Sequence, residues 1–189
     1  MRKKVILFYP IISPFYQEHW IPLSLLSLAG PLLENGYEVE IIDSRIRNNF
    51  EQSVLEEIDH ALCVGISMFT GDQIYYGLEM ARMIKDKRSD IPIVVGGWHP
   101  TIEPRTTIEH PLIDIVVRGQ GERTFTELVS HLDEKRSLDN VLGITYKENG
   151  KIKENPIRPL EDINDFPLLP YHLIDMEKYL PLSKFPREI

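Results

Sequence analysis

Hydrophobic residues gather in five short runs that alternate with longer stretches of helical periodicity. The runs are almost continuously apolar, as is typical of parallel strands that are covered on both faces. The predicted strands are residues 5–9, 37–42, 62–66, 91–95 and 113–117. Apolar residues three or four positions apart predict helices between them. The predicted helices are residues 22–35, 53–59, 71–87, 103–110 and 122–134.

This alternation predicts an α/β fold of the flavodoxin-like, doubly wound class, with a five-stranded parallel sheet in the order 2-1-3-4-5. After residue 135, residues 143–146 and 151–153 flank an Asn-Gly turn, which predicts a small β-hairpin. The segment from Asn155 is rich in proline and acidic residues, which predicts an extended tail with little regular structure. The predicted parts are a Rossmann-like domain (1–135), a hairpin appendage (136–155) and a Pro-rich linker (156–189).

Composition narrows the classes of function. The 189 residues carry a formal net charge of −8, which argues against nucleic acid and anionic membranes as partners, because both attract clustered Lys and Arg. The one cysteine, Cys63, lies in an apolar run, so we expect it to be buried; it allows neither an intramolecular disulfide nor a cysteine-ligated cluster. The lack of a possible disulfide fits a reducing cytosol, so we expect a cytoplasmic protein, and no run approaches the ~20 apolar residues of a membrane span.

Residues just after each strand are the candidates for binding, because ligands of open α/β sheets lie outside the carboxyl ends of the strands. Two of these positions carry glycine pairs, Gly96-Gly97 and Gly119-x-Gly121, where backbone can approach a large flat ligand. Neither pair matches a nucleotide phosphate loop. The candidate cofactor-binding residues are Pro10, Asp43, Ser67, Met68, Phe69, Thr70, Gly96, Gly97, Trp98, His99, Thr101, Arg118, Gly119, Gly121 and Glu122.

Several candidates also have a purely structural interpretation. Ser67, Thr70 and Thr101 could cap the helices that follow them, and the helix dipole favours a carboxylate such as Glu122 at a helix start. His99 stands alone in its loop, and the six histidines show no spacing typical of metal ligands. No nucleophile motif is present. The residues alone therefore predict a binding domain without catalytic residues or metal ligands.

Residues 94–101 (VVGGWHPT) and 114–128 (DIVVRGQGERTFTEL) carry a family resemblance, supported by LFYP at residues 7–10. They are similar to the amino-terminal cobalamin-binding domain of radical-SAM enzymes, a group that includes methyltransferases and the anaerobic Mg-protoporphyrin cyclase of bacteriochlorophyll synthesis. The resemblance covers residues 4–135. Residues 162–170 resemble the linker that leads to the radical-SAM barrel.

The resemblance implies a corrinoid at the carboxyl edge of the sheet, with its nucleotide tail entering between strands. Cobalamin domains generally carry D-x-H-x-x-G, S-x-L and G-G; residues 67–69 (SMF) resemble the second mark and residues 96–97 the third. The first mark is broken, because Arg45 stands two residues after Asp43 in place of the histidine. This implies a cobalt without a histidine ligand from the loop after the second strand. What occupies the lower face of the corrin is open, and the loop 10–21 is a candidate.

The cluster motif C-x-x-x-C-x-x-C is absent, so this chain alone cannot bind a 4Fe-4S cluster or cleave S-adenosylmethionine. The resemblance implies a C-terminal radical-SAM domain that holds both, in the same chain or a separate one, and acts on a small-molecule substrate. The favoured function is a module that holds cobalamin for methyl transfer or radical chemistry. The alternative is the same fold with cofactor binding lost, serving as a substrate-binding or docking module.

Two other uses of this fold fit the residues poorly. A response-regulator receiver needs a phospho-acceptor aspartate after the third strand, where this chain has Ser67-Met68. A flavin-binding domain needs a phosphate loop after the first strand, and residues 10–14 (PIISP) are a poor one. For the cobalamin interpretation, a bulky residue at Gly97 is expected to abolish corrinoid binding and to leave the fold intact.

Overall fold

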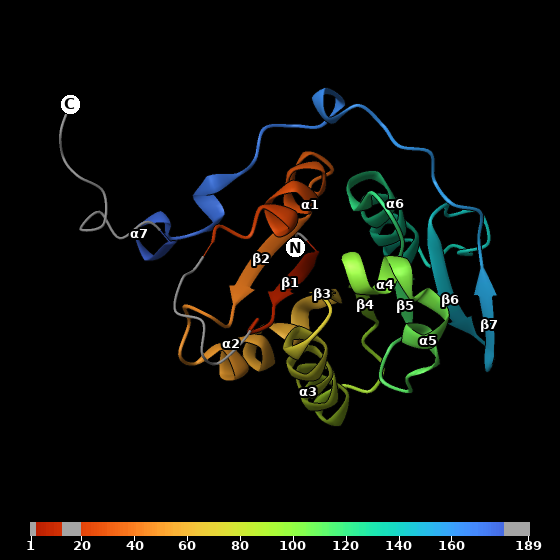
Figure 1. Cartoon of the computed structure of the whole chain (residues 1–189), viewed down its shortest axis with the longest axis horizontal. Helices are drawn as coiled ribbons and strands as arrows, with labels where there is room; N and C mark the ends of the chain where they lie inside the picture. The colour runs from red at the N-terminus through yellow and green to blue at the C-terminus, as the bar shows by residue number, and fades with distance from the viewer. Residues whose placement is uncertain (1–2, 13–19, 180–189) are drawn as a thin grey trace.

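The computed structural model describes residues 3–12 and 20–179. In this part of the chain seven strands form one sheet, in the order β2-β1-β3-β4-β5-β6-β7 (Figure 1). Strands β1 to β5 run parallel in the predicted order. Their bounds are β1 Lys4–Tyr9, β2 Glu38–Asp43, β3 Ala61–Ser67, β4 Ile93–Gly96 and β5 Ile115–Val117.

The hairpin belongs to the sheet, so the prediction of a five-stranded sheet with a separate appendage is wrong. Strand β6 (Ile144–Glu148) pairs antiparallel with β5 and with β7 (Lys151–Glu154). The predicted turn is confirmed, since Asn149 and Gly150 have φ of 50° and 74°, as a type I′ hairpin requires. Because β5 is a short strand at the end of the parallel sheet, β6 covers an edge that would otherwise expose unpaired backbone groups.

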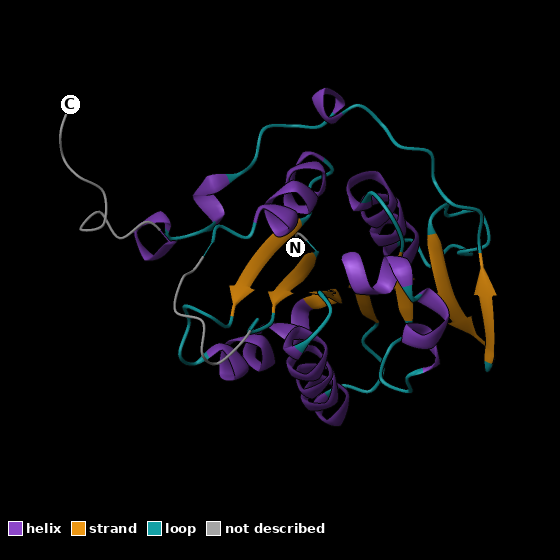
Figure 2. Cartoon of the chain, viewed as in Figure 1, coloured by secondary structure: helices purple, strands orange, loops and turns teal. Residues whose placement is uncertain are grey.

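Helices cover both faces of the sheet (Figures 1 and 2). Helices α1 (Leu23–Glu34) and α6 (Gly121–Asp133) pack on one face. Helices α2 (Phe50–Glu57) and α3 (Asp72–Lys87) pack on the other. No helix in the described ranges is long and apolar enough to cross a membrane.

The helix predicted at 103–110 is confirmed, and a second short helix, which was not predicted, precedes it. The confirmed helix is α5 (Pro104–Glu109), and the one before it is α4 (Trp98–Ile102). Pro104 has no N–H to continue the hydrogen bonding of α4, and its fixed φ suits the first position of α5. As a result α4 begins directly after β4, at the carboxyl edge where ligands of this fold class bind.

The core consists of two apolar layers, one on each face of the sheet. Alternate residues of β1 enter different layers, so that Leu7 faces α1 and α6 while Phe8 faces α2 and α3. Cys63 is fully buried, as predicted, and burial raises the pKa of its thiol to about 12. The thiol is therefore an inert packing group.

The segment after β7 packs along the domain. It passes over α6 and α1 and reaches the edge strand β2 (Figure 1). Its regular structure is brief, with two 3₁₀ turns (Ile163–Asp165 and Tyr171–Leu173) and helix α7 (Met176–Tyr179). Apolar side chains on it, Leu169 and Ile174 among them, pack against the α1/α6 layer of the core.

His110, at the end of α5, is expected to make stability depend on pH. Burial, and then the positive charge of Lys147, lower the pKa of His110. As pH falls, the unfolded state therefore binds a proton at His110 before the folded state does. The stability due to neutral His110 is present above about pH 6.5 and is lost as pH falls through the lower pKa of the folded state. In urea denaturation, wild type should lose more unfolding free energy than His110→Asn between about pH 7.5 and about pH 5.5. Equal losses would contradict this.

Candidate functional site

A cavity of about 300 Å³ lies at the carboxyl ends of β3, β4 and β5, between α1 and α6. Its apolar lining is Leu7, Leu25, Leu28, Ile66, Val94, Val117 and Phe125. Its glycines are Gly65, Gly96, Gly97, Gly119 and Gly121. Its polar residues are Ser24, Ser27, Ser67, Gln120 and Glu122. This is the edge at which open α/β sheets bind ligands.

Two glycines shape the floor of the cavity in different ways. A Cβ on Gly65, within β3, would lie 3.0 Å from Leu7 Cδ2 and 3.1 Å from Phe125 Cζ, so a larger residue there would crowd the packed wall. A Cβ on Gly96 would come no closer than 3.7 Å to any atom of Val117. Gly96 is therefore the position where an added side chain would occupy the cavity without collision. Sequence analysis missed Gly65, although a glycine inside an apolar strand often marks a close approach.

Gly97 joins two loops. Its φ is +108°, and a Cβ on it would lie 2.7 Å from the carbonyl oxygen of Met68. The Met68 N–H donates to the Gly96 carbonyl at 2.8 Å, and the His99 N–H donates to the Met68 carbonyl at 3.3 Å. The expectation that a bulky residue at Gly97 leaves the fold intact is therefore wrong, because it would strain the backbone and force these loops apart.

The cavity brings together six predicted residues: Ser67, Gly96, Gly97, Gly119, Gly121 and Glu122. Thr101 lies next to it, where its Oγ1 accepts a hydrogen bond of 3.0 Å from the Gly119 N–H and ties two loops together. The alternative role of Ser67, Thr70 and Thr101 as caps of the helices that follow them is wrong, since neither α3 nor α5 has a side-chain cap.

Two large aromatic residues, Phe69 and Trp98, follow the cavity-lining ends of β3 and β4. Phe69 and Trp98 expose 53% and 69% of their surface, so both rings are available to contact a ligand. Thr70 is exposed next to Phe69, and His99 is half-buried next to Trp98. These loops offer an apolar rim to a ligand that is too large for the cavity alone.

Gln73 organises this rim, and sequence analysis missed it. Its side chain is buried, and its Nε2 donates to the Pro10 carbonyl at 3.1 Å while its Oε1 accepts from the Phe69 N–H at 2.9 Å. It thereby fixes the loops after β1 and β3 relative to each other. The available signal was its helical spacing with Gly77 and Met80, which puts a polar residue on the buried face of α3.

Asp43 lies at the carboxyl edge, but other protein groups hold its side chain. Arg45 donates to it through Nη2 at 2.6 Å and through Nε at 2.9 Å. The hydroxyl of Tyr179 donates to its Oδ2 at 3.0 Å. Burial, and then the charge of Asp43, raise the pKa of Tyr179, so its phenol stays protonated and donates. Asp43 does not line the cavity.

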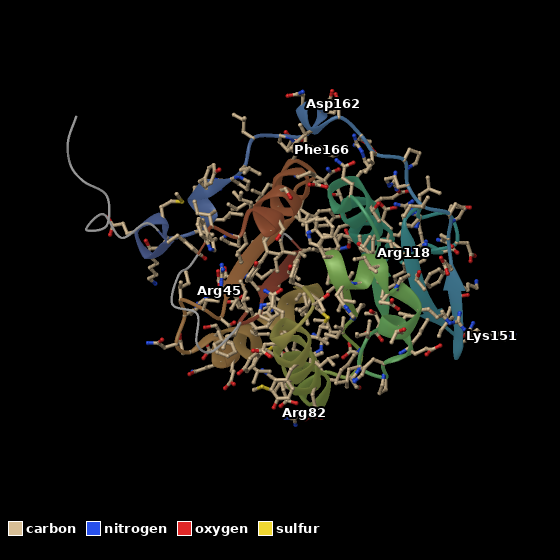
Figure 3. All side chains as sticks on the ribbon, viewed as in Figure 1. Arg45, Arg82, Arg118, Lys151, Asp162 and Phe166 are labelled. Carbon is tan, nitrogen blue, oxygen red and sulfur yellow. The ribbon has the colours of Figure 1, made fainter. Side chains whose placement is uncertain are left out.

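Arg118 is likewise held by the protein, on the far side of the molecule from Arg45 (Figure 3). It is buried and pairs with Glu154 at 2.7 Å. Its Nη2 donates to the carbonyl of Ile144 at 3.1 Å and to that of Asn155. Arg118 thus joins the end of β5 to β6 and to the start of the tail, and it does not line the cavity.

The described part of this edge holds no cluster of metal ligands. Among residues 3–12 and 20–179, no three His, Cys, Asp or Glu side chains could together hold a metal ion. The loop 10–21, which was the candidate for the open face of cobalt, falls mostly outside the described residues. What it contributes to a bound ligand stays a prediction.

Comparison with known proteins bears on this edge directly. The family model of the B12 binding domain matches residues 16–129. An uncharacterized methyltransferase of Pyrococcus horikoshii is 38% identical over 163 residues, which are 84% of this chain and 35% of that protein. The anaerobic magnesium-protoporphyrin IX monomethyl ester cyclase of Rubrivivax gelatinosus is 32% identical over 178 residues, 88% of this chain and 32% of that protein. The chain spans about a third of these relatives.

Solved structures share the fold. The radical S-adenosylmethionine methyltransferase TsrM of Kitasatospora setae, with cobalamin and a 4Fe-4S cluster bound, aligns with a TM-score of 0.68 at 24% identity, over 86% of this chain and 30% of that one. The cobalamin-dependent S-adenosylmethionine radical enzyme OxsB, with aqua-cobalamin and S-adenosylmethionine bound, aligns with a TM-score of 0.71 at 24% identity. The alignment covers 84% of this chain and 23% of that one. Because the family model spans more than half of the sequence, the resemblance is confirmed and the chain belongs to the B12-binding domain family.

Proposed function

We propose that this domain holds a cobalamin for a radical-SAM enzyme, and that the cavity takes the nucleotide tail of the cofactor. The observation that carries the proposal is the apolar cavity at the carboxyl edge of the sheet, within the matched region, which has free space at Gly96. A volume of about 300 Å³ accepts only part of a cobalamin. The corrin ring would then rest on the rim that carries Phe69 and Trp98.

The lining suits a flat aromatic base joined to a phosphate. Leu25, Leu28 and Phe125 bury the faces of a ring, while the hydroxyl of Ser67 can bond its polar edge. The first turn of α6 starts at Gly121 and carries backbone N–H groups without helical partners, which favour an anion. A domain fitted in this way binds and orients the cofactor.

Cobalamin, when bound, supplies a cobalt centre that carries a methyl group or takes part in radical chemistry. The loop after β2 offers no ligand to that centre, because Arg45 replaces the histidine of the general mark and is engaged by Asp43 at 2.6 Å. The cobalt would therefore be free of histidine ligation from this loop. Methyl transfer to a small-molecule substrate by a radical-SAM domain in cis, with its own S-adenosylmethionine and 4Fe-4S cluster, completes the proposal.

The alternative of a docking module that has lost its cofactor is not supported. The family match spans the strand ends that form the cavity. The departure at Arg45 removes a cobalt ligand, and Arg45 does not line the cavity.

A visible absorption titration with hydroxocobalamin, followed by desalting, tests the proposal. We expect the chain to retain stoichiometric cobalamin with a perturbed spectrum, because an enclosed apolar site releases its ligand slowly. Free cobalamin passed over the same column without protein is the control for carry-over. Complete loss of colour from a chain that stays folded by circular dichroism would contradict cofactor binding by this domain.

A further inference from the structure

Residues 155–179, here called the strap, are fastened at both ends by buried polar groups. At the start, Nδ2 of Asn155 donates to the carbonyls of Leu138 at 2.7 Å and Val141 at 2.8 Å. At the end, the hydroxyl of Tyr179 donates to Asp43 at 3.0 Å. Between these points the strap crosses α6 and then α1 (Figure 1). It therefore has a defined path over the two helices that wall the cavity.

Backbone groups of the strap hold the side chain of Gln120, a residue of the cavity wall. The Glu161 N–H donates to Oε1 of Gln120 at 2.8 Å, and Nε2 of Gln120 donates to the Glu161 carbonyl at 3.3 Å. The carboxylate of Glu161 also pairs with Arg123 at 3.2 Å. Gln120 lines the cavity and precedes α6. The orientation of a cavity-lining amide thus depends on where the strap lies.

A second contact fixes the strap to the next turn of α6. Nε of Arg158 donates to Oγ1 of Thr124 at 2.8 Å, and its guanidinium pairs with Glu127. Thr124 is fully buried, so its hydroxyl depends on this partner. The adjacent residue, Phe125, forms part of the cavity wall. The strap is therefore bonded to the segment of α6 that contributes to the cavity wall.

The strap reaches the opposite wall of the cavity at α1. A Cβ on Gly30 would lie 3.0 Å from Cγ of Pro167, so the strap packs directly on the helix backbone. Leu28 of the same helix lines the cavity, and a Cβ on Gly121 of α6 would lie 3.0 Å from it. Figure 3 shows Asp162 and Phe166 on the part of the strap that bridges the two helices. One short segment thus touches both walls.

We infer that the strap is a positioning element for the cofactor cavity, and that the pairing of Glu161 with Gln120 is the link between the two. Docking of the strap sets the separation of α1 and α6 and holds the amide of Gln120 in the wall. This inference rests on the proposed function. If docking of the strap favours cofactor binding, then bound cofactor must favour docking by the same factor. A merely structural role in stability carries no such reciprocity.

Hydrogen–deuterium exchange of the full chain, with and without hydroxocobalamin, measures that reciprocity. Amides of the strap, including the Glu161 N–H, should exchange several times more slowly when cobalamin is bound. Unchanged exchange in the strap of a cobalamin-loaded chain would overturn the inference and leave the proposed function standing. A wild-type chain that retains no cobalamin would remove the proposed function and the inference with it.

A matched pair of variants at Glu161 tests the link itself. Glu161→Pro removes the N–H that donates to Gln120, whereas Glu161→Gln keeps it and loses only the charge that pairs with Arg123. We expect the dissociation constant of cobalamin to rise about fivefold or more in Glu161→Pro and to change less than about twofold in Glu161→Gln. An unchanged dissociation constant in Glu161→Pro, with fast exchange showing that its strap is released, would overturn the inference.

Discussion

Gly96→Leu is expected to weaken cobalamin binding by at least about 30-fold, since overpacking a filled site costs on the order of 2 kcal/mol. A Cβ at this position has 3.7 Å of clearance, and Gly96 lines the cavity. The added side chain would therefore take the space that we assign to the nucleotide tail. Because the φ of Gly96 lies outside the left-handed region, the substitution brings no backbone strain. The domain should keep its unfolding free energy.

Titration of each variant with hydroxocobalamin, alongside urea denaturation, separates binding from folding. Gly96→Ala adds a single methyl group and should show a smaller loss of affinity. Gly97→Leu is the contrast, because a Cβ 2.7 Å from the Met68 carbonyl should lower stability as well as affinity. If Gly96→Leu binds cobalamin as tightly as wild type, the cavity is not where the cofactor lies.

The alternation of strands and helices was readable because its cause is local. Parallel strands buried on both faces must be apolar throughout, and residues 62–66 and 91–95 show that pattern without any knowledge of the fold. The attachment of the hairpin to the sheet was not readable in this way. It depends on the free edge of β5 and on contacts such as the Lys147 N–H donating to the Asp114 carbonyl at 3.0 Å, which no local pattern reveals.

The candidate site shows the same division. Glycine pairs after β4 and β5 correctly indicated an opening at the carboxyl edge. The sequence does not reveal which of these glycines has room for a side chain, since that depends on how the Met68 loop packs on Gly97. Asp43 and Arg118 lie at this edge, but the distant Tyr179 helps to hold Asp43, and residues 144–155 hold Arg118. A sequence pattern carries no record of those long-range partners.

Arg45→Met is expected to lower the free energy of unfolding by about 3 kcal/mol or more, because it leaves a buried carboxylate without its cation. The side chains of Arg45 and Asp43 are 5% and 2% exposed. The guanidinium also donates to the Trp20 carbonyl at 2.8 Å and lies over the ring of Tyr9, 4.2 Å from its centroid. Methionine keeps most of the apolar volume, so the loss reports the charge and its hydrogen bonds.

Urea denaturation of Arg45→Met, of Asp43→Asn and of the double variant measures the coupling. The double variant should recover part of the stability lost in Arg45→Met, since it no longer buries an unpaired charge. A loss below about 1 kcal/mol in Arg45→Met would mean that solvent screens the pair. The cobalamin affinity of folded Arg45→Met, measured by titration with hydroxocobalamin, tests whether the pair also acts on cofactor binding. Because the pair holds Tyr179 and the end of the strap against β2, the inference above predicts weaker cobalamin binding in the folded variant, whereas unchanged affinity would show that this end of the strap does not act on the cofactor site.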